Sequence, residues 1–147
     1  METYDTIPEM AAFEVTSELV NRISKKNYDF IVTNFANTDM VGHTGNLSAT
    51  IKAVETLDNC LGNLYNSCKK NGYTLIVTSD HGNADMMFDN NKDIPCTTHS
   101  LNPVPFIICE SCDFSSKKGS LSDIAPTILK LLGIPKPNDM NGKPLIK

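Results

Sequence analysis

Hydrophobic residues recur along the chain with two different periods, and these periods predict alternating helices and strands. A spacing of three to four residues, typical of an amphipathic helix, is found in residues 8–26, 47–70 and 122–132. Short runs rich in β-branched and aromatic residues, typical of strands, occupy residues 28–34, 73–79 and 104–109. The order helix, strand, helix, strand, loop, strand, helix predicts an α/β fold with a mainly parallel sheet.

Residues at the ends of these segments favour helix termini. Pro8 suits a first helical turn, and Ser122 can cap the last helix. Gly72 and Gly133 follow the second and third helices as C-caps. Residues 37–45 and 80–103 are polar and predict loops, and the tail from Ile134 predicts a surface excursion. Three strands are few for an α/β sheet, so we expect a segment of a larger one.

Charge and cysteine content argue against several classes of partner and site. The chain has 13 basic and 17 acidic residues, a net charge of −4, and no basic run, so we expect no nucleic-acid partner. Its apolar runs are too short to cross a bilayer, and we expect no membrane partner. Five irregularly spaced cysteines indicate free thiols and a cytoplasmic setting. Cys109 and Cys112 match C-x-x-C, but no second pair completes a zinc site.

All three histidines lie in polar segments at or after a predicted strand. His43 follows Asp39 by four residues, a spacing that lets both face one ion from a single helical turn. His81 follows Asp80 directly after the strand of residues 73–79, and His99 lies later in the same loop. Because ligands of open α/β sheets gather where strands end, we expect these five side chains to bind metal.

Carboxylates and neutral imidazoles suit Mn²⁺ or Zn²⁺, and the histidines make Mg²⁺ less favoured. Five ligands are more than one tetrahedral ion needs, which suggests two ions. Bound dications would also let an acidic chain attract a phosphate ester. The alternative is that each histidine is a hydrogen-bonded or surface residue and that Asp80–Gly82 is a turn. No serine or threonine stands in an evident nucleophile setting, and Thr78 and Ser79 are expected to pack or cap.

Three longer motifs resemble those of one enzyme family. Residues 37–45 (NTDMVGHTG), 78–85 (TSDHGNAD) and 98–106 (THSLNPVPF) are similar to C-terminal motifs of cofactor-independent phosphoglycerate mutases. Residues 4–10 and 123–129 also match, so the similarity covers nearly the whole chain in order. The string Asp-His-Gly is shared across the wider alkaline-phosphatase-like superfamily, whereas Asp-Met-Val-Gly-His-x-Gly is much narrower and favours the mutase.

The resemblance implies a partial alkaline-phosphatase-like, three-layer α/β/α fold. Residues 1–147 would form the C-terminal segment of the metal-binding phosphatase-like domain. Asp39, His43 and His99 would hold one ion. Asp80 and His81 would hold a second with ligands outside this chain. Both ions are typically Mn²⁺, with Mg²⁺, Co²⁺ or Zn²⁺ as alternatives. The family's nucleophilic serine and inserted phosphotransferase domain match nothing in this sequence, so we expect no catalytic residue and no organic cofactor site here.

For the complete enzyme, the resemblance implies a monomeric isomerase of glycolysis. It would interconvert 3-phosphoglycerate and 2-phosphoglycerate through a phosphoserine, without 2,3-bisphosphoglycerate as a cofactor. The chain alone is expected to be inactive. Two alternatives stay open: a segment of another superfamily member, such as a phosphopentomutase or a phosphatase, and an inactive metal-binding fragment.

Overall fold

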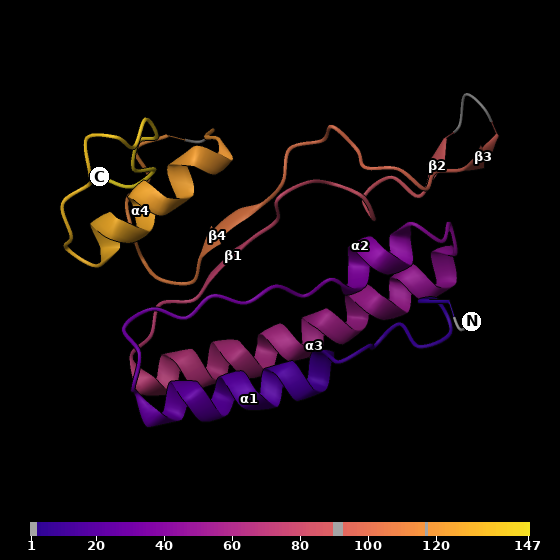
Figure 1. Cartoon of the computed structure of the whole chain (residues 1–147), viewed down its shortest axis with the longest axis horizontal. Coiled ribbons are helices and arrows are strands. Elements are labelled where there is room, and N and C mark those ends of the chain that lie inside the picture. The colour runs from indigo at the N-terminus through magenta and orange to yellow at the C-terminus, as the bar shows by residue number, and fades with distance from the viewer. Residues whose placement is uncertain (1–2, 90–92, 117) are drawn as a thin grey trace. The chain divides into compact units, whose positions relative to one another are not determined.

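The computed structural model describes residues 3–89, 93–116 and 118–147, and it confirms a mixed α/β chain. Contacts divide the chain into two compact units, Met1–Cys109 and Glu110–Lys147. The helices are α1 (Ala12–Lys25), α2 (Asn37–Gly42), α3 (Leu47–Asn71) and α4 (Ile124–Leu131) (Figure 1). The strands are β1 (Ile76–Thr78), β2 (Phe88–Asp89), β3 (Ile94–Pro95) and β4 (Phe106–Ile108).

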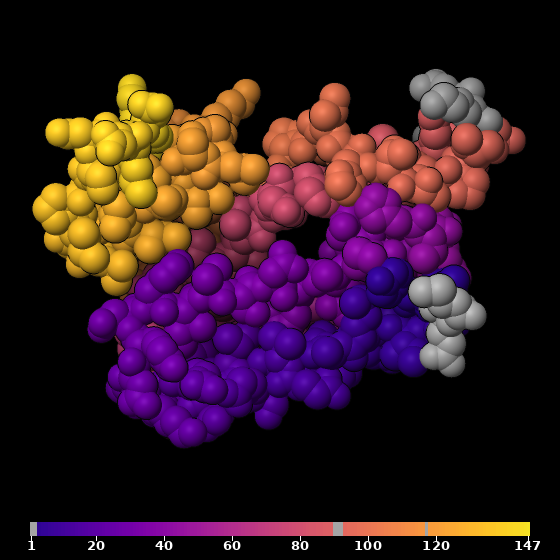
Figure 2. Space-filling view, in the orientation of Figure 1, coloured from indigo at the N-terminus to yellow at the C-terminus, as the bar shows by residue number. Residues whose placement is uncertain are grey.

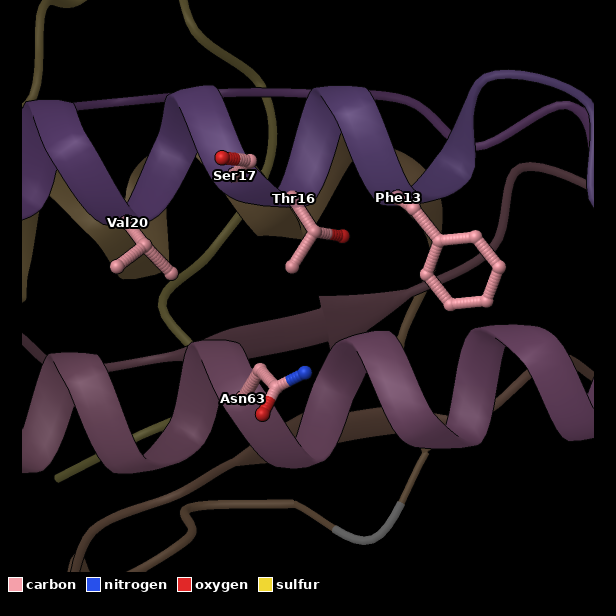
Figure 3. A pocket seen from close by; sticks show the side chains of 5 residues that line it. All are labelled: Phe13, Thr16, Ser17, Val20 and Asn63. Carbon is pink, nitrogen blue, oxygen red and sulfur yellow. The ribbon is translucent and has the colours of Figure 1, made fainter.

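In the first unit, α1 and α3 lie side by side (Figure 1). Ile23 of α1 and Leu64 and Cys68 of α3 are buried between them, and Ile31 and Leu75 pack against this cluster. Burial of such side chains contributes about 1.5–3 kcal/mol each and holds the pair together. A groove of about 300 Å³ also lies between the two helices (Figure 3), lined by Phe13, Thr16, Ser17, Val20 and Asn63. This lining contains no side chain that commonly binds a metal.

The predicted start of the first helix was wrong. Met10 has a φ of 46°, a left-handed conformation that a right-handed helix cannot contain, so α1 begins at Ala12 and Pro8 precedes it. The second predicted helix is confirmed as α3. The side chain of Asn46 accepts a hydrogen bond from the Ala49 N–H at its start, and Gly72, with a φ of 77°, ends it.

The predicted parallel sheet is not found among the described residues. β1 pairs with β4 in antiparallel register, with Val77 opposite Ile107, and β2 pairs with β3 in the same sense. The loop predicted over residues 80–103 contains the β2–β3 hairpin and turns the chain back, so β4 returns antiparallel to β1. Residues 28–34 belong to no ladder in the described chain, although Ile31 packs on the helical core.

In the second unit, α4 follows a 3-10 turn, Leu121–Asp123. Ser120 and Asp123 form a capping box on this turn, and Asp123 is the N-cap residue of α4, so the predicted Ser122 cap was wrong. Gly133 ends the helix with a φ of 68°, as expected. The tail is not wholly a surface excursion, because Leu145 and Ile146 are buried.

All five cysteines are free, as predicted. None of the helices in the described part of the chain combines the length and the apolarity that a bilayer span requires.

Candidate metal centre

The short helix α2 presents two of the predicted ligands. The sequence predicted a loop over residues 37–45, but Asn37–Gly42 is helical and is anchored by Val41, which is fully buried against Ala49 and Ala53 of α3. His43 caps α2, and its N–H donates to the carbonyl oxygen of Asp39. One turn therefore separates the two side chains, and Nε2 of His43 lies 3.2 Å from Oδ1 of Asp39. The two side chains of the expected i,i+4 pair therefore lie close together on one turn.

The third ligand, His99, comes from the segment between β3 and β4. Figure 2 shows residues 93–105 lying against the part of the chain that contains α2. The Ser100 N–H donates to the carbonyl oxygen of Gly82 at 2.9 Å and fixes the backbone beside His99. Nε2 of His99 then lies 3.2 Å from Oδ1 of Asp39 and 3.1 Å from Nε2 of His43. The three ligand atoms thus form a nearly equilateral triangle.

The dimensions of this triangle fit one metal ion. Ligand atoms about 2.1 Å from an ion lie about 3.0 Å apart in octahedral geometry and about 3.4 Å apart in tetrahedral geometry. The observed separations of 3.1 to 3.2 Å fall between these values. The side chains of Asp39, His43 and His99 are 32%, 39% and 48% exposed, so an ion can reach them from solvent.

The tautomer of His43 also fits a cation. Its Nδ1 lies 2.7 Å from the carbonyl oxygen of Thr97, an acceptor, so Nδ1 bears the hydrogen. In the neutral ring, Nε2 therefore directs a lone pair at the carboxylate of Asp39. Such a pair repels at 3.2 Å unless a proton or a metal ion lies between the two atoms. Backbone-fixed imidazoles of this kind are typical of metal-binding histidines.

Asp80 and His81 lie beside the triangle without joining it. The ring of His81 stacks on that of His99 at a centroid distance of 3.7 Å. Its Nδ1 is 4.0 Å from Oδ1 of Asp39, and its Nε2 is 3.7 Å from Oδ1 of Asp80. The side chain of Asp80 is 72% exposed. The structure thus brings the five predicted residues to one region, with three of them converging on a point.

Hydroxyl groups near the site already have acceptors. Ser79 Oγ donates to the carbonyl oxygen of His81 at 2.6 Å, and Thr78 Oγ1 donates to that of Pro105 at 3.0 Å. Both side chains stabilise local backbone, as predicted from their place at the end of a strand.

Sequence reasoning missed the polar side chains that support the ligands. Asn83 donates to Asp39, and Asp85 accepts from Ser100 and Asn102. The available signal was position, because Asn83 and Asp85 follow His81 within the same motif.

Comparison with known proteins places the chain in a family. The model of the metalloenzyme superfamily matches residues 1–136. The chain is 52% identical to the 2,3-bisphosphoglycerate-independent phosphoglycerate mutase of Gracilaria tenuistipitata var. liui, over 100% of this chain and 29% of that protein. It is 55% identical to the enzyme of the same name from Wolbachia pipientis wMel, over 99% of this chain and 29% of that protein.

The fold is likewise similar to a solved structure, that of Leishmania mexicana phosphoglycerate mutase crystallised at low cobalt concentration. The TM-score is 0.87 and the identity 32%, over 99% of this chain and 30% of that chain. This similarity supports a partial alkaline-phosphatase-like fold. The chain spans about 29% of the length of the curated relatives it matches. Since the family model matches most of the sequence, the chain belongs to the metalloenzyme superfamily.

Proposed function

We propose that this chain is the metal-binding portion of a cofactor-independent phosphoglycerate mutase, which interconverts 3-phosphoglycerate and 2-phosphoglycerate. The observation behind the proposal is the Asp39–His43–His99 triangle, in a chain similar to such mutases along nearly its whole length. The activity is that of the complete protein. Residues 1–147 would be the C-terminal segment of its phosphatase-like domain, with the nucleophilic serine and the phosphotransferase domain supplied by other segments.

In this proposal, Asp39, His43 and His99 hold one Mn²⁺ ion. Asp80 and His81 hold a second together with ligands from the rest of the protein. When bound, the ions supply positive charge that stabilises phosphoryl oxygens and a deprotonated hydroxyl. In the neutral ring of His43, the hydrogen bond to Thr97 places the hydrogen on Nδ1 and leaves Nε2 with the lone pair that binds the ion. The partly exposed ligand side chains leave an open side for a phosphate ester.

The proposal includes a cytoplasmic, monomeric protein that binds neither nucleic acid nor membrane. Five free thiols support a reducing compartment. The acidic net charge of −4 argues against binding to polyanions. A small anionic substrate would instead be attracted by the bound cations.

A chimeric enzyme tests this function directly. Residues 1–147 would replace the matching segment of the Wolbachia mutase, and conversion of 3-phosphoglycerate would be followed with a coupled assay in Mn²⁺. We expect mutase activity in the chimera and a loss of more than about 100-fold on His43→Ala, beyond the effect typical of outer-shell changes. Thermal melting and metal content provide the control for folding. A folded, Mn²⁺-loaded chimera that does not form 2-phosphoglycerate would exclude the proposal.

A further inference from the structure

One short segment, residues 83–85, contacts both of the chain segments that supply the Asp39–His43–His99 triangle. Asn83 reaches Asp39 on α2, 44 residues earlier, and Asp85 reaches Ser100, the neighbour of His99, 15 residues later. Neither Asn83 nor Asp85 belongs to the triangle itself.

The contact of Asn83 with Asp39 is partly buried and has one orientation. Nδ2 of Asn83 donates to Oδ1 of Asp39 at 2.7 Å and lies 3.3 Å from the Asp39 carbonyl oxygen. Both of these atoms are acceptors, so rotation of the amide by 180° would place oxygen against oxygen. Asn83 is only 6% exposed, and its Oδ1 has no hydrogen-bond partner among the described residues. The hydrogen bonds of the amide therefore orient it toward the ligand carboxylate.

Packing leaves Asn83 little freedom to move away. A β-carbon added to Gly42 would overlap Oδ1 of Asn83. Gly42, which lies between Val41 and the ligand His43 in the sequence, is buried. Because Gly42 has no side chain, the amide of Asn83 can approach α2. The amide and the helical turn that presents Asp39 and His43 thus fit against each other.

Asp85 fixes the other side of the triangle. Its Oδ2 accepts hydrogen bonds from Ser100 Oγ at 2.8 Å and from Asn102 Nδ2 at 2.6 Å. These bonds lower the pKa of the Asp85 carboxyl, so it is ionised and acts only as an acceptor. A β-carbon on Gly82 would overlap Ser100 Oγ and lie 2.7 Å from Oδ1 of Asp85. The hydrogen bonds between Asp85 and Ser100 therefore lie close to Gly82, the residue that follows His81.

We propose that Asn83 and Asp85 are positioning residues that form a polar bracket around the metal centre. Asn83 sets the orientation of the Asp39 carboxylate, and Asp85 holds the backbone from which His99 extends. The bracket thereby preorganises ligands from two segments that are distant in sequence. This inference rests on the proposed metal site, and it assigns a role to residues that bind no ion themselves.

Cobalt binding by the 147-residue chain tests the bracket, because Co²⁺ reports both affinity and ligand geometry through its visible spectrum. The test variants are Asn83→Ala and Asp85→Ala. Asp58→Ala and Asn66→Ala, on the exposed surface of α3, are the matched controls. We expect each test variant to bind Co²⁺ about 10–100-fold more weakly, with an altered spectrum. The controls should match the unaltered chain, and the metal-free test variants should keep its circular dichroism spectrum.

Two conservative variants separate positioning from folding. Asp85→Asn keeps an oxygen that accepts from Ser100, so it should recover part of the affinity lost in Asp85→Ala. Asn83→Leu keeps the branched shape of asparagine without a donor, so it should lose affinity even if Asn83→Ala fails to fold. A folded Asn83→Leu or Asp85→Ala chain with unchanged Co²⁺ affinity and spectrum would overturn the bracket. If the unaltered chain bound no Co²⁺, the metal centre itself would be wrong, and the bracket with it.

Discussion

His43 and Thr97 are joined by a hydrogen bond in which Nδ1 of the imidazole lies 2.7 Å from the main-chain carbonyl oxygen. The bond connects the C-terminal end of α2 to Thr97, 54 residues further along the chain, in the segment that also contains His99. It determines which ring nitrogen bears the hydrogen, and so which one can bind a metal ion. The same contact thus joins the two segments that supply the histidines and fixes the tautomer of one of the rings.

Replacing His43 and His99 together by alanine should abolish tight metal binding. The double variant keeps only Asp39 from the triangle, and a single partly exposed carboxylate binds divalent ions weakly. We would titrate the metal-free chain with Mn²⁺ by calorimetry and expect one clear site that the double variant lacks. Asp58→Ala, on the exposed surface of α3, is the control. Equal losses in the control and the double variant would contradict the ligand assignment.

The long elements of the fold were predictable, whereas α2 was not. Helix α3 has 25 residues with regular hydrophobic spacing, an Asn46 cap and a terminal Gly72, so local signals agree. Helix α2 has six residues, too few to show a period. It is stabilised by tertiary contacts: Val41 is buried, and the amide of Asn37 donates to the carbonyl oxygens of Pro8 and Glu9. Contacts between residues so far apart in the sequence cannot be predicted from the local spacing of hydrophobic residues.

The ligands were predictable to a similar extent. The spacing of Asp39 and His43 predicted that these two side chains lie on one turn, whereas the grouping of His99 with them came only from the resemblance to phosphoglycerate mutases. The antiparallel return of β4 and the contacts of Asn83 were not, because they depend on how residues 80–103 fold back over α2. A neutral asparagine also has no metal-binding signature of its own.

Gly42→Ala should destabilise the chain, whereas Gly62→Ala should stabilise it. The new methyl group at residue 42 overlaps Oδ1 of Asn83, and overpacking of this kind costs about 1–3 kcal/mol. Gly62 is in the middle of α3, and no neighbouring group of the described chain comes within 4 Å of a β-carbon added there. Alanine at residue 62 therefore gains about 0.5–1 kcal/mol through helix propensity. Urea unfolding followed by circular dichroism measures both changes.

Gly42→Ala should also weaken Mn²⁺ binding, since it displaces the amide that orients Asp39. Gly62→Ala should leave that affinity unchanged. If the two substitutions had the same effect on unfolding, the close approach of Asn83 to α2 would be excluded.

The five cysteines should divide into two classes of reactivity. Cys60 and Cys68 are buried in α3, and burial, with a smaller contribution from nearby Cys109, raises the pKa of the Cys68 thiol. Because the thiolate is the reactive form, Cys68 should be alkylated slowly. The other three cysteines are partly exposed and should react first: Cys96, Cys109 and Cys112. Iodoacetamide labelling at pH 8 with peptide mass spectrometry checks this order. Unfolding in urea should abolish the difference in reactivity between the two classes. Rapid labelling of Cys68 in the folded chain would contradict the packing of α1 on α3.

Acid should loosen the second unit through Asp123. This carboxylate accepts hydrogen bonds from the main-chain N–H groups of Ser120 and Lys143, both at 2.8 Å, and so ties the tail to the start of α4. These bonds, the one from Lys143 most of all, lower the pKa of Asp123 below its ordinary value of 3.8. Because the pKa is lower in the folded form, the ionised carboxylate of Asp123 contributes its full stabilisation above about pH 4. This contribution is lost as the pH falls through the pKa of the folded form.

The amide resonances of Ser120 and Lys143 should therefore shift together as the pH is lowered below about 4, a range set by the ordinary pKa of aspartate. Nuclear magnetic resonance of the labelled chain measures the two amides individually. In Asp123→Ala the shift should vanish, and both amides should exchange faster at every pH. Asp139→Ala, on the exposed tail, should behave like the unaltered chain. If the pH-dependent shift of the Lys143 amide resonance were the same in Asp123→Ala as in the unaltered chain, another group would have to hold the tail.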